Sequence, residues 1–110
     1  MESVRVVDLD PTAAAAVASL AAIGMQSGAT VVGLSAVRRC PDPALLFIAS
    51  GLAAGTRAEL CRLASRKCAR LFRLADLGVL TSRFGRQDVL VVAVRRGDLA
   101  AGMVAKLQPP

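Results

Sequence analysis

Two kinds of apolar segment alternate along the chain. Short continuous runs between turn residues occur at 44–49 (ALLFIA) and at 89–94 (VLVVAV). Such runs predict strands that are buried on both faces of a sheet. A longer run at 13–25 is rich in alanine, follows Pro11 and is itself followed by Gln-Ser-Gly, which predicts a helix. The chain is therefore expected to combine buried strands with long helices.

Turn and capping signals place the remaining elements. Thr56 and Glu59 fit a capping box, in which both side chains bind amides at the start of a helix that continues to about Lys67. We also expect short strands at 4–8, 30–32 and 69–72, short helices at 35–40 and 75–81, a polar loop at 83–88, and a last helix from 97 to about 106. This alternation predicts an α/β sandwich with a mixed or mostly parallel sheet. We expect one domain over 1–110, in which residues 1–10 form an extended N-terminal segment.

The composition narrows the kind of core and the kind of partner. Hydrophobic residues make up 55% of the chain and aromatic residues only 3%, so alanine, valine and leucine must build the core. Little material is present for stacking unpaired bases, because the aromatic residues are only Phe47, Phe72 and Phe84.

Positive charge is concentrated in the later part of the chain. The net charge is +6, and from Gly33 onward thirteen basic residues stand against five acidic ones. Twelve of the fourteen basic residues are arginine, whose planar guanidinium matches phosphate oxygens and base edges. This asymmetry favours an anionic partner, nucleic acid first. A GC-rich coding sequence would also raise the arginine content without any such function.

Residue types exclude several classes of chemistry. The chain has no histidine and no Cys-x-x-Cys pair, so we expect neither a zinc site nor another cofactor. Without a histidine base or a close pair of carboxylates, we expect no catalysis. The three cysteines are predicted to be reduced and buried: Cys40, Cys61 and Cys68. The acidic start of the chain and the small polar residues of 12–32 argue against a signal peptide and a membrane span, so a cytoplasmic protein is expected.

The segment GLSAVRRC at 33–40 is the most specific candidate for binding. Gly33 allows another backbone to approach closely, and Ser35 and Arg39 are four residues apart on one helix face, with Arg38 beside them. A glycine, a short polar side chain and arginines could together hold an RNA backbone. The alternative interpretation is a turn followed by an ordinary short surface helix.

Two other segments have simpler explanations. The loop 50–56 leads from a strand into a helix, but it lacks the Gly-Lys-Ser/Thr ending of a nucleotide-binding loop. An ordinary turn explains it. Several basic residues occupy the helix and strand that follow, where a solvated helix face explains them equally well: Arg57, Arg62, Arg66, Lys67, Arg70 and Arg73.

The order of elements and motifs over 13–107 resembles the ribosomal protein L-seven-Ae/L-thirty-e superfamily, and is most similar to its small bacterial YlxQ-like members. The matching features are a helix followed by SGATVVG, the strand LLFIA, the strand LFRL leading into Asp76-Leu77-Gly78, the loop Gly85-Arg86, the strand VLVVAV and a final helix. The resemblance implies a three-layer α/β/α sandwich with a mixed sheet of roughly four strands. It also implies binding to kink-turn or related structured RNA.

The resemblance assigns two RNA-contacting walls. In the first, Gly33 matches the glycine that opens the recognition helix of the family, and Arg39 stands at its lysine. Leu34, Ser35 and Ala36 replace the family's threonine, asparagine and glutamate, which puts specific recognition of sheared G·A pairs in doubt. The second wall is the loop 79–87, about three residues longer than usual, with these candidate contacts: Leu80, Arg83, Phe84 and Arg86.

These observations lead to two hypotheses. The first is a non-catalytic protein that binds structured RNA, ribosomal RNA among the candidates, between a wall of Gly33, Ser35, Arg38 and Arg39 and a wall of Arg83, Phe84 and Arg86. The second is a protein-interaction or scaffold module on the same fold that has lost specific RNA recognition. In that case the alanine-rich first helix or the edge strand VRVVD would form a homodimer or partner interface.

Overall fold

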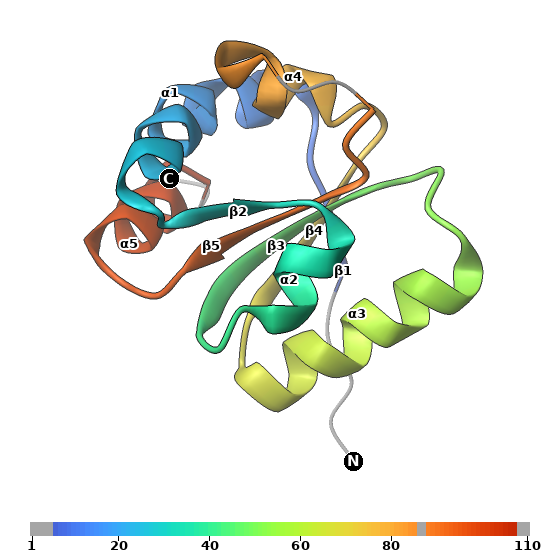
Figure 1. Ribbon diagram of the computed structural model, residues 1–110. Coiled ribbons are helices and arrows are strands. Elements are labelled where there is room, and N and C mark those ends of the chain that lie inside the picture. The colour runs from blue at the N-terminus through green and yellow to red at the C-terminus, as the bar shows by residue number, and fades with distance from the viewer. Residues whose placement is uncertain (1–5, 86–87, 108–110) are drawn as a thin grey trace.

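The computed structural model describes residues 6–85 and 88–107, which form a mixed α/β fold around a five-stranded sheet (Figure 1). The strands are β1 (Val6–Asp8), β2 (Thr30–Val32), β3 (Pro43–Ala49), β4 (Arg70–Leu74) and β5 (Val91–Arg95). Their order across the sheet is β1-β4-β3-β5-β2. β1 and β3 each pair in parallel with β4, whereas β5 pairs antiparallel with both β3 and β2. The predicted mixed sheet is thereby confirmed.

The sheet has five strands rather than four because the N-terminal segment joins it. Val6, Val7 and Asp8 pair with Leu71, Phe72 and Arg73 of β4. The guanidinium of Arg73 donates two hydrogen bonds to the carboxylate of Asp8, at 2.6 and 3.0 Å. The short strand predicted at 4–8 is therefore present over Val6–Asp8 as an edge strand, and its first two predicted residues, 4 and 5, lie outside the described residues.

Helices connect the strands at nearly the predicted positions. They are α1 (Pro11–Ser27), α2 (Leu34–Arg39), α3 (Ala54–Lys67), α4 (Gly78–Thr81), the 3₁₀ helix η1 (Ser82–Phe84) and α5 (Asp98–Leu107). The start of α1 is capped by Asp10, whose carboxylate accepts a hydrogen bond of 2.7 Å from the amide of Ala13. No helix in the described part of the chain is long and apolar enough to cross a membrane.

Helices pack against both faces of the sheet (Figure 1). Side chains of α1, α4 and α5 form one core with alternate strand residues, among them Phe47 and Phe72, whose rings stack with centroids 5.4 Å apart. Side chains of α2 and α3 form a second core with the intervening residues, such as Leu46 and Ile48. The continuous apolar run of β3 is explained by this burial on both faces.

Three predicted element starts are wrong. α3 begins at Ala54, so Thr56 already lies inside the helix and no side chain caps its start; the predicted capping box does not form. α4 begins at Gly78 rather than at 75, after a turn in which the carboxylate of Asp76 accepts a hydrogen bond of 2.8 Å from the Gly78 amide. β5 begins at Val91, because Leu90 stands outside the core with 50% of its surface exposed.

The cysteines are all free, but only one is buried as predicted. Cys40 closes α2 inside the structure, Cys61 is half-buried on α3, and Cys68 is exposed. Cys68 ends α3 in the left-handed conformation, with a φ of 57°, and this turn directs it away from the core. The prediction for Cys61 and Cys68 treated them as core residues without knowing which helix face is solvated.

Candidate nucleic-acid interface

The first predicted wall begins at one end of the sheet, where Gly33 follows β2. Because β2 runs antiparallel to β5, Gly33 at the end of β2 lies beside the start of β5. The Gly33 amide donates a hydrogen bond of 3.0 Å to the carbonyl of Val91. β3 and β4 also finish here, where Ser50 follows β3 and donates to the carbonyl of Leu74 at 2.8 Å. We call this the Gly33 end, and the opposite end, where β5 finishes, the Arg95 end.

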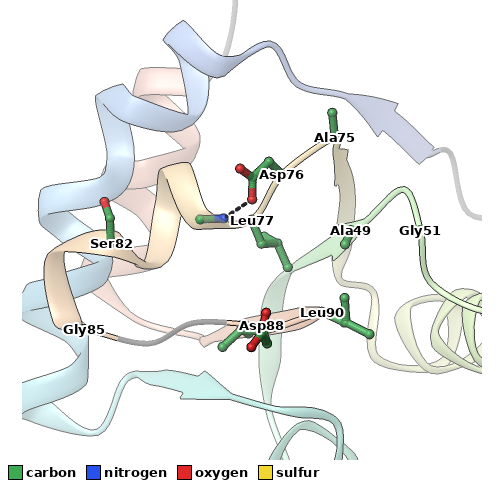
Figure 2. A pocket seen from close by; sticks show the side chains of 11 residues that line it. Ala49, Gly51, Ala75, Asp76, Leu77, Ser82, Gly85, Asp88 and Leu90 are labelled. Atoms are coloured by element: carbon green, nitrogen blue, oxygen red, sulfur yellow. Dashed lines mark hydrogen bonds between the residues drawn. The ribbon is translucent and has the colours of Figure 1, made fainter.

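A cavity of about 580 Å³ lies at the Gly33 end (Figure 2). It is walled by the end of β3 and the loop after it, by the turn after β4 together with α4 and η1, and by the segment that leads into β5: Ala49, Gly51, Ala75, Asp76, Leu77, Gly78, Ser82, Gly85, Asp88, Val89 and Leu90. In open α/β sheets, ligands characteristically bind outside the carboxyl ends of strands, which is where this cavity lies with respect to β3 and β4.

The cavity presents acidic groups. Asp76 comes from the turn after β4 and Asp88 from the segment before β5, so two distant parts of the chain each contribute a carboxylate. A carboxylate accepts hydrogen bonds and repels phosphate. The cavity is therefore suited to a group that donates hydrogen bonds, such as a nucleobase amino group, rather than to a phosphate.

Gly33 occupies a conformation that requires glycine. Its φ of 95° lies in the left-handed region, and a side chain there would be strained although the space around it is open. The carbonyl of Gly33 accepts a hydrogen bond of 2.9 Å from Val37, which holds the first turn of α2. Ser35 is exposed on that turn. Both residues are therefore open to a partner at the Gly33 end.

The two arginines of GLSAVRRC do not point to the Gly33 end. Arg38 donates hydrogen bonds of 2.7 and 2.9 Å to the carboxylate of Glu59 on α3. The hydrogen bonds from Arg38 lower the pKa of Glu59, and the same bonds raise the pKa of Arg38. Arg39 lies in the last turn of α2 and lines a separate hollow with Pro41 and Arg95 at the Arg95 end.

The second wall is only partly available. Leu80 has no exposed surface and packs in the core shared by α1, α4 and α5, so it can support the loop but cannot contact a partner. Arg83 is exposed in η1, between Ser82 and Gly85, which both line the cavity. Phe84 belongs to η1, and Arg86 lies outside the described residues.

Sequence reasoning missed Asp76 and Asp88 as site residues. Asp76 was noted only as part of a family motif, and Asp88 only as the end of a polar loop. The available signal was their position, one directly after a predicted strand and the other directly before one. Polar residues at the same edge of a sheet are candidates for a common site.

No model of a known protein family matches the chain, and no curated protein does either. Within 6–85 and 88–107, no cluster of cysteine, aspartate or glutamate side chains could hold a metal ion. The site is therefore characterised by its own geometry.

Proposed function

We propose that the protein binds structured RNA at the Gly33 end and does not catalyse a reaction. The observation that carries this proposal is the hydrogen bond from the Gly33 amide to Val91, which joins the start of α2 to the segment that closes the cavity. An open glycine backbone and a hollow beside it resemble, in outline, the two RNA-contacting walls of the L-seven-Ae/L-thirty-e superfamily. Helices on both faces of the sheet fit the three-layer α/β/α sandwich of that superfamily.

The proposed mechanism assigns separate roles to backbone and carboxylates. Gly33 and Ser35 lie against the RNA backbone, and Arg83 neutralises a phosphate. An unpaired base enters the cavity, where Asp76 and Asp88 accept hydrogen bonds from its amino groups, as carboxylates do with cytosine N4. Arg38 is not assigned to phosphate, because its guanidinium is already bound to Glu59.

The first test is a titration of the protein with a kink-turn RNA and with a plain RNA duplex of equal length, at about 50 mM and 200 mM salt. We expect tighter binding to the kink-turn. Asp88→Asn removes a negative charge and one acceptor, so it should reduce the preference for the kink-turn while duplex binding stays equal or becomes tighter. Asp98→Asn makes the same charge change at the start of α5, at the opposite end of the sheet, and should change the affinities for both RNAs together while their ratio stays intact.

Arg83→Gln tests the phosphate contact at this site. We expect the slope of log affinity against log salt to become shallower by about 1 for the kink-turn. Arg62→Gln removes the same charge from the exposed face of α3 and is the matched control. Equal affinities for kink-turn and duplex, unchanged by Asp88→Asn, would contradict recognition at the Gly33 end.

The second candidate function is a protein-interaction module. β1 is an edge strand with Val7 41% exposed, and α1 exposes 57% of Ile23. An exposed edge strand can pair with another chain. Size-exclusion chromatography with light scattering tests this: a tight dimer that protects residues 33–40 from proteolysis, together with absent RNA binding, would favour the interaction module.

A further inference from the structure

Positive charge gathers at the end of the sheet opposite the cavity. α2 and α3 both finish there, β4 begins there and β5 ends there (Figure 1). Six exposed basic residues occupy these positions: Arg39, Arg66, Lys67, Arg70, Arg95 and Arg96. Only Asp42 and Asp98 oppose them among the described residues at this end. We call these six residues the Arg95 surface.

Two hollows make the Arg95 surface continuous across the end of the sheet. Arg70 and Arg96 line one, of about 400 Å³, together with Cys68. Arg39 and Arg95 line the other, of about 360 Å³. Since Arg95 and Arg96 are neighbours in the chain, the two hollows flank the end of β5. The surface therefore extends from the α2 side of the sheet to the α5 side.

Local hydrogen bonds hold part of this surface in place. The side chain of Arg96 donates to the carbonyl of Lys67 at the end of α3, and the Arg96 amide donates to the carbonyl of Asp42 at 2.9 Å. Arg95 forms an ion pair of 2.8 Å with Asp42. Arg39, Arg66 and Arg70, by contrast, form no ion pair with any of the described residues. They are available to an external anion.

The chemistry of this surface favours the phosphates of a duplex. Clustered like charges repel one another, so binding of an anionic partner reduces the electrostatic repulsion that is present in the free protein. Arginine binds phosphate oxygens in a fork-like geometry. The residues that line the two hollows include no aromatic side chain on which an unpaired base could stack. Contacts restricted to phosphates fit a double-stranded segment held without sequence preference.

We propose that the Arg95 surface binds the phosphate backbone of an RNA duplex. If the Gly33 end binds structured RNA, the protein then bridges two RNA segments, and this bridging role rests on the proposed function. The binding of phosphates at the Arg95 surface does not depend on the proposed function. β3 has seven residues and runs roughly 23 Å from one end to the other, so the two surfaces face different segments of RNA.

The test compares two variants with equal loss of charge. Arg39→Gln, Arg66→Gln and Arg70→Gln are combined in one protein, which keeps every ion pair of the described residues. Arg57→Gln, Arg62→Gln and Lys106→Gln are combined in the control. The affinity of the first variant for a plain RNA duplex should be at least about tenfold lower at low salt. Its slope of log affinity against log salt should be shallower by about 2 to 3. The control should lose much less, and equal losses in the two proteins would overturn the proposal.

A second measurement locates the bound duplex. Cys68 is exposed in the hollow with Arg70 and Arg96, whereas Cys61 is half-buried on α3. The alkylation of each cysteine by N-ethylmaleimide is measured by mass spectrometry. A saturating concentration of duplex should slow the alkylation of Cys68 severalfold and leave the alkylation rate of Cys61 unchanged. Unchanged alkylation of Cys68 would refute duplex binding at this surface.

The outcomes separate this inference from the proposed function. The preference for a kink-turn over a duplex should survive in the Arg39, Arg66 and Arg70 variant, because that preference belongs to the Gly33 end. If the wild-type protein shows no preference for the kink-turn while the variant still loses duplex binding, the proposed function is wrong and phosphate binding at the Arg95 surface is supported. If the variant loses binding to polyglutamate but not to the duplex, the surface belongs to an acidic protein partner and the inference fails.

Discussion

At the scale of single residues, two glycines inside helices have opposite physical roles. Gly24 of α1 is buried against Thr30, the first residue of β2, and a Cβ atom at this position would lie 2.0 Å from Oγ1 of Thr30 and 2.6 Å from Cδ2 of Leu99. Gly102 of α5 has room, since a Cβ atom there would meet only Cδ1 of Leu20, at 4.0 Å. Helix propensity disfavours both glycines, but only Gly24 is required by packing.

These contacts predict opposite effects of the same substitution. Gly24→Ala should lower the free energy of unfolding by about 1–3 kcal/mol, because the added methyl group forces α1 away from β2. Gly102→Ala should raise it by about 0.5–1 kcal/mol through helix propensity. Urea denaturation followed by circular dichroism measures both. A Gly24→Ala protein as stable as the wild type would contradict the close approach of α1 to Thr30.

At the scale of elements, ion pairs between exposed side chains link neighbouring segments. Arg38 and Glu59 join α2 to α3, Arg73 and Asp8 join β4 to β1, and Arg95 is paired with Asp42. In each pair, the hydrogen bond from the arginine is the main cause that lowers the pKa of the carboxyl group. Exposed pairs of this kind contribute modestly to stability. Their larger effect is to fix which segments lie side by side.

The lowered pKa of Glu59 predicts how stability depends on pH. Because the carboxylate is favoured in the folded state, its contribution is fully present above the ordinary glutamate pKa of about 4.3 and is lost as the pH falls through the lowered value. Glu59→Gln should therefore reduce the loss of stability between about pH 5 and pH 2. Urea midpoints are measured for Arg38→Gln, Glu59→Gln and the double variant. The coupling free energy between Arg38 and Glu59, obtained from these variants, should be present near pH 7 and absent at low pH, where Glu59 is protonated. A coupling free energy that does not change with pH would refute this account.

At the scale of the whole molecule, the two ends of the sheet differ in character. Two aspartates line the cavity at the Gly33 end, whereas five arginines and Lys67 lie exposed at the Arg95 end. A molecule polarised in this way approaches a polyanion with its basic end first, since long-range electrostatic attraction orients the encounter. The strands of the sheet run between these two ends, with one core on each face.

The three free thiols report on the integrity of the whole fold. Cys68 is exposed, Cys61 half-buried and Cys40 only 6% exposed, so alkylation by iodoacetamide should be fastest at Cys68 and slowest at Cys40. Modification of Cys40 requires opening of the structure around α2 and should increase with urea in parallel with unfolding. Peptide mass spectrometry assigns the sites. Rapid labelling of Cys40 without denaturant would show that α2 opens independently of the rest.

Local patterns in the sequence determined most of the elements. Buried runs identified β3 and β5, and proline and glycine marked the ends of α1 and α2. The errors at Thr56 and Leu90 arose where the start of an element depends on its neighbours rather than on its own residues. The resemblance to an RNA-binding superfamily predicted one site formed by Gly33 and the loop 79–87. Gly33 and the cavity that Ser82 and Gly85 line lie at the same end of the sheet, and a common RNA site there stays a prediction.

The sequence by itself determined an arginine-rich α/β protein without histidine chemistry, because composition and apolar periodicity are local properties. Only the tertiary structure decided where each arginine lies. Arg38 is bound to a glutamate 21 residues away, and Leu80 belongs to the core rather than to the surface. Four arginines line two hollows at the end of the sheet opposite the predicted site: Arg39, Arg70, Arg95 and Arg96. Strand order and direction bring these residues together, and no pattern of neighbouring residues encodes such long-range placement.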